Sequence, residues 1–231
     1  EQMAQEGVEE LILDLRCNGG GALSSAVTLT SALLPADYEG KMLCCVRRNP
    51  KNTISETEST FLLKNTGSAL NLRNGTIICS GYSASASEMV ITGLRGVGVP
   101  VTLIGLSTEG KNCGMDVTRR SIGSLYLEYA PITFMCYNAE GFGDYGEGIA
   151  PDVDLTAQNA FGVSDEFYPL PRCAWGDISH DIGLAVAVAS ITGKSITQAE
   201  TSRACGGDVV ELTDMAMPRP LVGARLYSED E

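Results

Sequence analysis

Two segments of this chain carry the same order of elements: a short apolar run, a turn of small residues and a helical pattern. The apolar residues of 8–15 lead into the glycine turn of 16–21, and residues 22–34 show apolar side chains at helical spacing. The apolar run 76–80 is followed by a serine-rich turn, a helix of about three turns and a second apolar run, 101–105. Alternating strands and helices predict an α/β fold with a largely parallel central sheet flanked by helices.

Other segments add strands and one helix to this core. The sequence MLCCV at 42–46 predicts a further buried strand, and the polar residues 50–59 predict a loop. A β-hairpin is expected with its turn at 121–124, where the sequence is SIGS. Residues 181–192 predict an amphipathic helix that ends at Gly193.

The charge and hydropathy of the chain exclude some classes of partner. It has 29 acidic and 16 basic residues among 231, a formal net charge of -13. Such a field repels phosphate backbones, so we expect no nucleic-acid partner. No apolar run approaches the roughly 18 residues needed to span a bilayer, so we expect no integral membrane segment within this chain.

Eight cysteines and one histidine, His180, give little support for a metal site. No two cysteines have CxxC spacing, so a structural zinc site is disfavoured and we expect no metal or other cofactor. The cysteines at positions 44, 45, 79 and 136 lie inside apolar runs. They are predicted to be buried free thiols rather than parts of a disulfide framework.

Ser85 is the first candidate for a chemical role. It lies in SASASE at 83–88, where a strand turns into a helix and backbone N–H groups have no helical partner. The same residues have a purely structural interpretation. A serine followed three residues later by a glutamate, here Glu88, is a capping box that needs no chemistry.

A serine nucleophile needs a base, and the sequence offers two candidates. His180 stands in an SHD context at the start of a predicted helix, which is more typical of a surface or capping residue. Lys111 follows the predicted strand 101–105 in a glycine-flanked loop, and a buried lysine can act as a base. The alternative for Lys111 is an ordinary solvated surface charge.

The glycine turn supplies a third candidate feature. Backbone N–H groups of Gly20 or Gly21 can approach a bound carbonyl closely, because no side chain intervenes. Three glycines can equally form a flexible turn without further function.

Taken in order, four motifs resemble one known family. They are LILDLRCNGGG at 11–21, SASASE at 83–88, GK at 110–111 and GEGIAPDVDL at 146–155. Together they are similar to the catalytic domain of the C-terminal processing (tail-specific) serine peptidases of peptidase family S41. The resemblance covers about residues 6–155.

The resemblance implies roles for individual residues. Ser85 corresponds to the family's nucleophile and Lys111 to its general base. Backbone N–H groups of Gly20 or Gly21, together with that of Ala86, correspond to the oxyanion hole. The implied reaction is hydrolysis of extended polypeptides through an acyl-enzyme, with no metal or cofactor.

The family also implies an architecture. We expect a ClpP/crotonase-like layered core with β-hairpin additions over residues 1–193, and a C-terminal extension over 194–231 that packs on it. Similar proteins carry a helical region, usually a PDZ domain, and a further strand before this core. We therefore expect a homo-oligomer or pairing with such an N-terminal part. By family analogy the protein is expected in the bacterial cell envelope.

Two departures from the family pattern keep other functions open. Members often carry a glutamine where this chain has Met115, and some carry an aspartate where it has Gly96. Both departures favour an alternative, a catalytically impaired peptide-binding module of the same fold. A crotonase-like acyl-CoA enzyme is a third possibility, although no basic cluster is available for the phosphates of coenzyme A.

Overall fold

The computed structural model describes residues 2–51, 56–67, 69–155, 174, 176–193 and 225–228. Its helices are α1 (Gln2–Gln5), α2 (Leu23–Leu33), α3 (Ala86–Gly96) and α4 (Ile182–Thr192), with a 3-10 turn at Ala36–Tyr38. Its strands are β1 (Ile12–Asp14), β2 (Met42–Arg48), β3 (Glu58–Leu62), β4 (Gly75–Cys79), β5 (Val101–Gly105), β6 (Cys113–Met115), β7 (Thr118–Ile122), β8 (Leu125–Tyr129), β9 (Ile132–Asn138), β10 (Val153–Asp154) and β11 (Arg225–Ser228).

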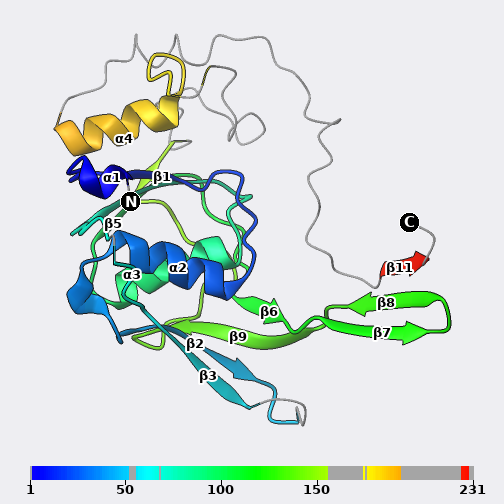
Figure 1. Ribbon diagram of the computed structural model, residues 1–231. Coiled ribbons are helices and arrows are strands. Elements are labelled where there is room, and N and C mark those ends of the chain that lie inside the picture. Colours follow the sequence, from blue (N-terminus) through cyan, green and yellow to red (C-terminus); the bar gives the residue numbers. More distant parts are fainter. Residues whose placement is uncertain are drawn as a thin grey trace.

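The core is a parallel sheet with the strand order β1-β4-β5-β10. Successive side chains of a strand face opposite sides of the sheet. Consecutive residues of β4 and β5 are buried, so both faces of these strands are covered. Ile77 and Leu103 pack with α2 and α3, whereas Ile78 and Ile104 pack with α4. Figure 1 shows α2 and α3 on one side of this sheet and α4 on the other. The predicted α/β core with a parallel sheet is confirmed.

A second, antiparallel sheet has the strand order β3-β2-β9-β6. The predicted strand MLCCV is β2 of this sheet, where Cys44 and Val46 pack with Met89 of α3. The loop predicted over residues 50–59 extends too far, because β3 begins at Glu58 and pairs with β2. Burial alternates along β3, so this strand has one exposed face. The polar residues of that face made the segment resemble a loop in the sequence.

The predicted hairpin is formed by β7 and β8, joined by the two residues Gly123 and Ser124. It extends away from the rest of the fold in Figure 1. Strand β11 pairs antiparallel with β8, opposite Leu125 to Glu128. This pairing was not predicted. The rest of the expected extension 194–231 lies outside the described residues.

Helix α4 confirms that residues 181–192 form a helix, but the predicted amphipathic pattern was wrong. The Asp181 carboxylate caps its start by accepting a hydrogen bond from the Leu184 N–H at 3.0 Å, and Gly193 ends it at φ 67°. The helix is apolar nearly all round rather than strongly amphipathic. No helix among the described residues has both the length and the apolar character needed to cross a membrane.

The buried cysteines are free thiols, as predicted. Cys44, Cys45, Cys79 and Cys136 are buried and form no disulfide. Burial raises the pKa of Cys44, Cys79 and Cys136 to about 12. These thiols therefore stay protonated at neutral pH and act as small apolar side chains.

Candidate active site

Ser85 stands at a sharp turn immediately before α3. Its backbone angles, φ 58° and ψ -115°, lie in a region that non-glycine residues rarely adopt. Its carbonyl accepts the first helical hydrogen bond, from the Met89 N–H at 2.9 Å. Strained backbone of this kind persists where the surroundings hold it in place, and it gathers at functional sites.

The glycine turn packs directly against this serine. The Asn18 carbonyl accepts hydrogen bonds from the Ala84 N–H at 3.2 Å and from the Ser87 hydroxyl at 2.8 Å. At Gly20, φ is 100°, and a Cβ would lie 2.6 Å from the Ala84 oxygen and 2.8 Å from Ser85 Cβ. Only glycine fits this close approach, so the turn is a shaped part of the site rather than a flexible link.

Both candidate glycines line the cavity in front of Ser85, and the N–H of one of them has an acceptor within the turn. The Gly20 N–H donates to the Asn18 side-chain oxygen at 3.0 Å and so stabilises the turn itself. Gly21 lines the cavity in front of Ser85. Ala86 is the first residue of α3, a position whose N–H has no acceptor within the helix.

Glu88 joins the serine turn to the lysine loop. This fully buried carboxylate accepts hydrogen bonds from the N–H groups of Ser85 at 2.7 Å and Lys111 at 2.9 Å through one oxygen. Its other oxygen accepts from the Gly110 N–H at 2.7 Å and the Thr108 hydroxyl at 2.6 Å. The expected contact between Glu88 and Ser85 is therefore present, and the same carboxylate also holds the residues on which Lys111 is carried.

The segment after β9 closes on the other side of the lysine loop. The Ile149 N–H donates to the Thr108 hydroxyl at 2.8 Å. A Cβ at Gly110 would lie 2.4 Å from the Gly146 carbonyl oxygen, so the two segments are in direct backbone contact. The motif GEGIAPDVDL thus holds the lysine loop in position, which explains its place beside the other motifs.

Ser85 and Lys111 line the same cavity, of about 1030 Å³, together with Gly20 and Gly21. Lys111 is half-buried there. Over the described part of the chain, no hydrogen bond joins the side chains of Ser85 and Lys111. Catalytic hydrogen bonds are often long before substrate binds, so this geometry is compatible with a dyad.

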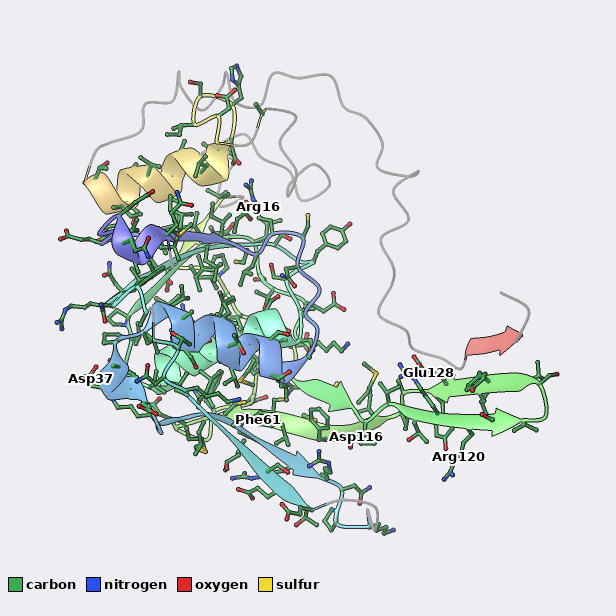
Figure 2. The ribbon with its side chains drawn as sticks, viewed as in Figure 1. Arg16, Asp37, Phe61, Asp116, Arg120 and Glu128 are labelled. Atoms are coloured by element: carbon green, nitrogen blue, oxygen red, sulfur yellow. The ribbon has the colours of Figure 1, made fainter. Side chains whose placement is uncertain are left out.

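Asp116, one of the carboxylates that line the cavity with Lys111, has other partners. Asp116 accepts a hydrogen bond from Arg48 Nε at 3.1 Å and another from the Thr133 hydroxyl at 2.8 Å. The bond from Arg48 lowers the pKa of Asp116, against the opposing effect of partial burial. Figure 2 shows Asp116 and Glu128 where the hairpin joins the body of the fold. Asp116 thus forms an ion pair with Arg48.

His180 takes no part in this cavity. It is exposed, and its Nδ1 lies 2.7 Å from an oxygen of Asp177 near the start of α4. The residues that line the cavity do not include it. Among the described residues, no group of three or more His, Cys, Asp or Glu side chains could hold a metal ion.

The two departures from the family pattern occupy different places. Met115 lines the cavity, and its thioether is too weak a partner to orient an amine. Gly96 lies at the far end of α3, about 15 Å along the helix from its start. A Cβ at Gly96 would lie 2.7 Å from the Asn138 side-chain nitrogen, so a larger residue has no room there.

Comparison with known proteins agrees with this architecture. The model of peptidase family S41 matches residues 1–155, and the chain therefore belongs to that family of serine peptidases. A protein of Staphylococcus haemolyticus named "Probable CtpA-like serine protease" is 28% identical over 160 residues, which are 69% of this chain and 30% of that protein. A Staphylococcus epidermidis protein of the same name is 28% identical over 152 residues, 66% of this chain and 28% of that protein.

A solved structure shows the same fold. The crystal structure of a Bacteroides fragilis NCTC 9343 protein named "Putative S41 protease" superimposes with a TM-score of 0.68 at 26% identity, covering 83% of this chain and 47% of that one. The chain spans less than a third of the length of these two curated relatives.

Some residues of the site were not found from the sequence. The spacing of Ser85 and Glu88 indicated a cap, but nothing local indicated that Glu88 also holds the lysine loop. Asn18 was passed over because only the glycines of its turn were considered. Its side chain, two residues before Gly20, is a typical turn signal that could have been used.

Proposed function

We propose that this chain is the catalytic part of a serine endopeptidase that hydrolyses extended polypeptides with a Ser85–Lys111 dyad. The observation that carries the proposal is the shared anchor of the two residues. The backbone N–H groups of Ser85 and Lys111 donate to the same oxygen of buried Glu88, while both residues line one cavity. A structural cap alone does not require the second contact.

The proposed reaction is acyl transfer. Lys111, in its uncharged form, accepts the hydroxyl proton of Ser85 as the serine oxygen attacks the scissile carbonyl carbon. The N–H groups of Gly21 and Ala86 donate to the oxyanion that forms. Lys111 then passes the proton to the leaving amine, and a water activated by the same lysine hydrolyses the acyl-enzyme.

An extended polypeptide has a place to bind beside this dyad. Strand β6 is at the end of its sheet, and all three of its residues, Cys113 to Met115, line the cavity. The free edge of such a strand can pair with the backbone of an extended peptide. Phe61 and Phe134 form part of an apolar wall for substrate side chains.

The compartment and assembly follow only from analogy. Relatives are bacterial CtpA-like serine proteases. We propose a location in the cell envelope, and association of this chain with a further N-terminal part or with a second copy.

A catalytically impaired peptide-binding module is the second candidate function, and Met115 is the observation that favours it. The Met115 thioether cannot hydrogen-bond Lys111 strongly, so it does not supply the orienting contact that a glutamine would give there. The hypothesis of a crotonase-like acyl-CoA enzyme is rejected, because the chain belongs to a peptidase family.

The test is cleavage of an unstructured polypeptide by the full-length protein and by its Ser85→Ala and Lys111→Ala variants. Ser124→Ala and Lys64→Ala are matched controls, because both residues are exposed and neither lines the cavity. We expect both dyad variants to lose nearly all activity and both controls to keep it. Binding without cleavage by the unaltered protein supports the peptide-binding module instead.

A further inference from the structure

A buried ion pair connects the first motif to the helix α4. Arg16 is 5% exposed and Asp181 is 6% exposed. The guanidinium donates two hydrogen bonds to the Asp181 carboxylate, at 2.9 Å and 2.6 Å, in the bidentate geometry typical of strong pairs. Asp14 holds the same guanidinium, accepting hydrogen bonds from Nε at 3.0 Å and, at 2.5 Å, from the Nη2 that also contacts Asp181.

The same carboxylate also defines where α4 begins. Asp181 Oδ1 accepts the hydrogen bond from the Leu184 N–H that caps the helix. Ile182, Val186 and Ala187 pack on the sheet face opposite α3. Figure 2 places Arg16 on the side of the sheet where α4 lies. Asp181 therefore ties Arg16 to a helix that is itself packed on the core.

Arg16 in turn leads directly into the glycine turn. The Arg16 carbonyl accepts a hydrogen bond from the Ser80 hydroxyl. Two residues later, the Asn18 carbonyl holds the serine turn at Ala84, and the Asn18 side chain holds the Gly20 N–H. A displacement of Arg16 would therefore move the donors in front of Ser85.

We propose that Asp181 is a positioning residue of the active site, which holds the glycine turn in its reactive geometry through Arg16. Helix α4 lies beyond residues 1–155, the part that the family model matches. The proposal makes this helix part of the catalytic machinery. It rests on the proposed function, in which the turn supplies a donor to the oxyanion.

The energetics of buried ion pairs agree with a geometric role. Burying Arg16 and Asp181 beside Asp14 costs about as much as their attraction returns, so apolar side chains would stabilise the fold comparably. What apolar side chains cannot do is fix an arginine by two directed hydrogen bonds. The pair therefore contributes a defined position for residue 16 more than it contributes net stability.

The first test follows the glycine turn without requiring activity. Amide hydrogen exchange is compared in the full-length protein and its Asp181→Asn, Asp181→Glu and Asp177→Asn variants. Asp177 is the matched control, since it lies in the same loop but pairs with exposed His180. In Asp181→Asn we expect exchange over residues 15–21 to rise by about tenfold or more, with partial recovery in Asp181→Glu.

Strands β4 and β5 serve as the internal reference in that experiment. Their exchange, and that of the turn in Asp177→Asn, should match the unaltered protein. Unchanged exchange over residues 15–21 in Asp181→Asn overturns the proposal. So does a rise that β4 and β5 share equally, because that reports general unfolding.

The second readout separates positioning from stability. In Asp181→Asn we expect kcat per folded molecule to fall by about tenfold to a hundredfold while KM stays within about twofold, since the oxyanion donor acts in the transition state. An unchanged kcat overturns the proposal. If the unaltered protein cleaves nothing, the proposed function fails, and hydrogen exchange alone decides whether Asp181 holds the turn.

Discussion

Replacing Glu88 by glutamine tests the anchor that joins the two halves of the site. The carboxylate accepts four hydrogen bonds, from Ser85, Lys111, Gly110 and Thr108. Glutamine keeps the shape but only one oxygen, so two buried donors would face its NH₂ group. Two charge-assisted hydrogen bonds at about 1.5–3 kcal/mol each give a loss of about 3–6 kcal/mol. That is a large part of the typical stability of a domain.

Urea unfolding at neutral pH measures this loss, and peptide cleavage in the absence of urea measures its effect on the site. Glu58→Gln is the matched control, because Glu58 forms an exposed pair with Arg47 at 3.4 Å worth at most about 1 kcal/mol. We expect Glu88→Gln to lower kcat by about a hundredfold per folded molecule, since Ser85 and Lys111 lose their common anchor. A Glu88→Gln variant as stable and as active as Glu58→Gln would refute the reasoning.

Three further predictions follow from single contacts. Gly20→Ala should abolish peptide cleavage, because its Cβ would lie 2.6 Å from a backbone oxygen, whereas Gly146→Ala, with nothing within 4 Å, should retain cleavage. The bond from Arg48 lowers the pKa of Asp116 in the folded protein. The ionised carboxylate therefore contributes its full stability above the unfolded pKa of about 3.9, and this contribution is lost as pH falls through the folded pKa. Thermal unfolding between pH 5 and pH 2 should therefore depend less steeply on pH in Asp116→Asn. Burial raises the pKa of Cys79 to about 12. The protonated thiol therefore contributes its full stability below the unfolded pKa of about 8.5, and this contribution is lost as pH rises toward 12. Cys79→Ala should accordingly show a smaller fall in melting temperature between pH 8 and pH 11.

Local patterns were enough to predict the core. Continuous apolar runs around Ile77 and Leu103, bounded by turns and followed by helical spacing, indicated strands buried on both faces. The hairpin turn at Gly123 and the end of α4 at Gly193 were predictable for the same reason. Each depends on a glycine at positive φ within a few residues of the element it ends.

Contacts between distant segments could not be predicted in this way. Arg16 and Asp181 are 165 positions apart, and nothing in either neighbourhood indicates the other. The polar sequence of β3 concealed a strand, because its pairing with β2 provides the stabilisation that its composition does not indicate. For Glu88, the spacing to Ser85 was visible, but its bond to the Lys111 N–H depends on how β5 is placed beside α3.

The most direct test of the central claim is to identify the residue that carries the acyl group. The full-length protein is mixed with an activated ester of a short peptide, the reaction is stopped with acid, and the modified residue is located by mass spectrometry. The account predicts an adduct on Ser85 that is absent in Ser85→Ala and forms far more slowly in Lys111→Ala. Turnover of the ester with the adduct on another residue, or with no adduct at any time, would contradict it.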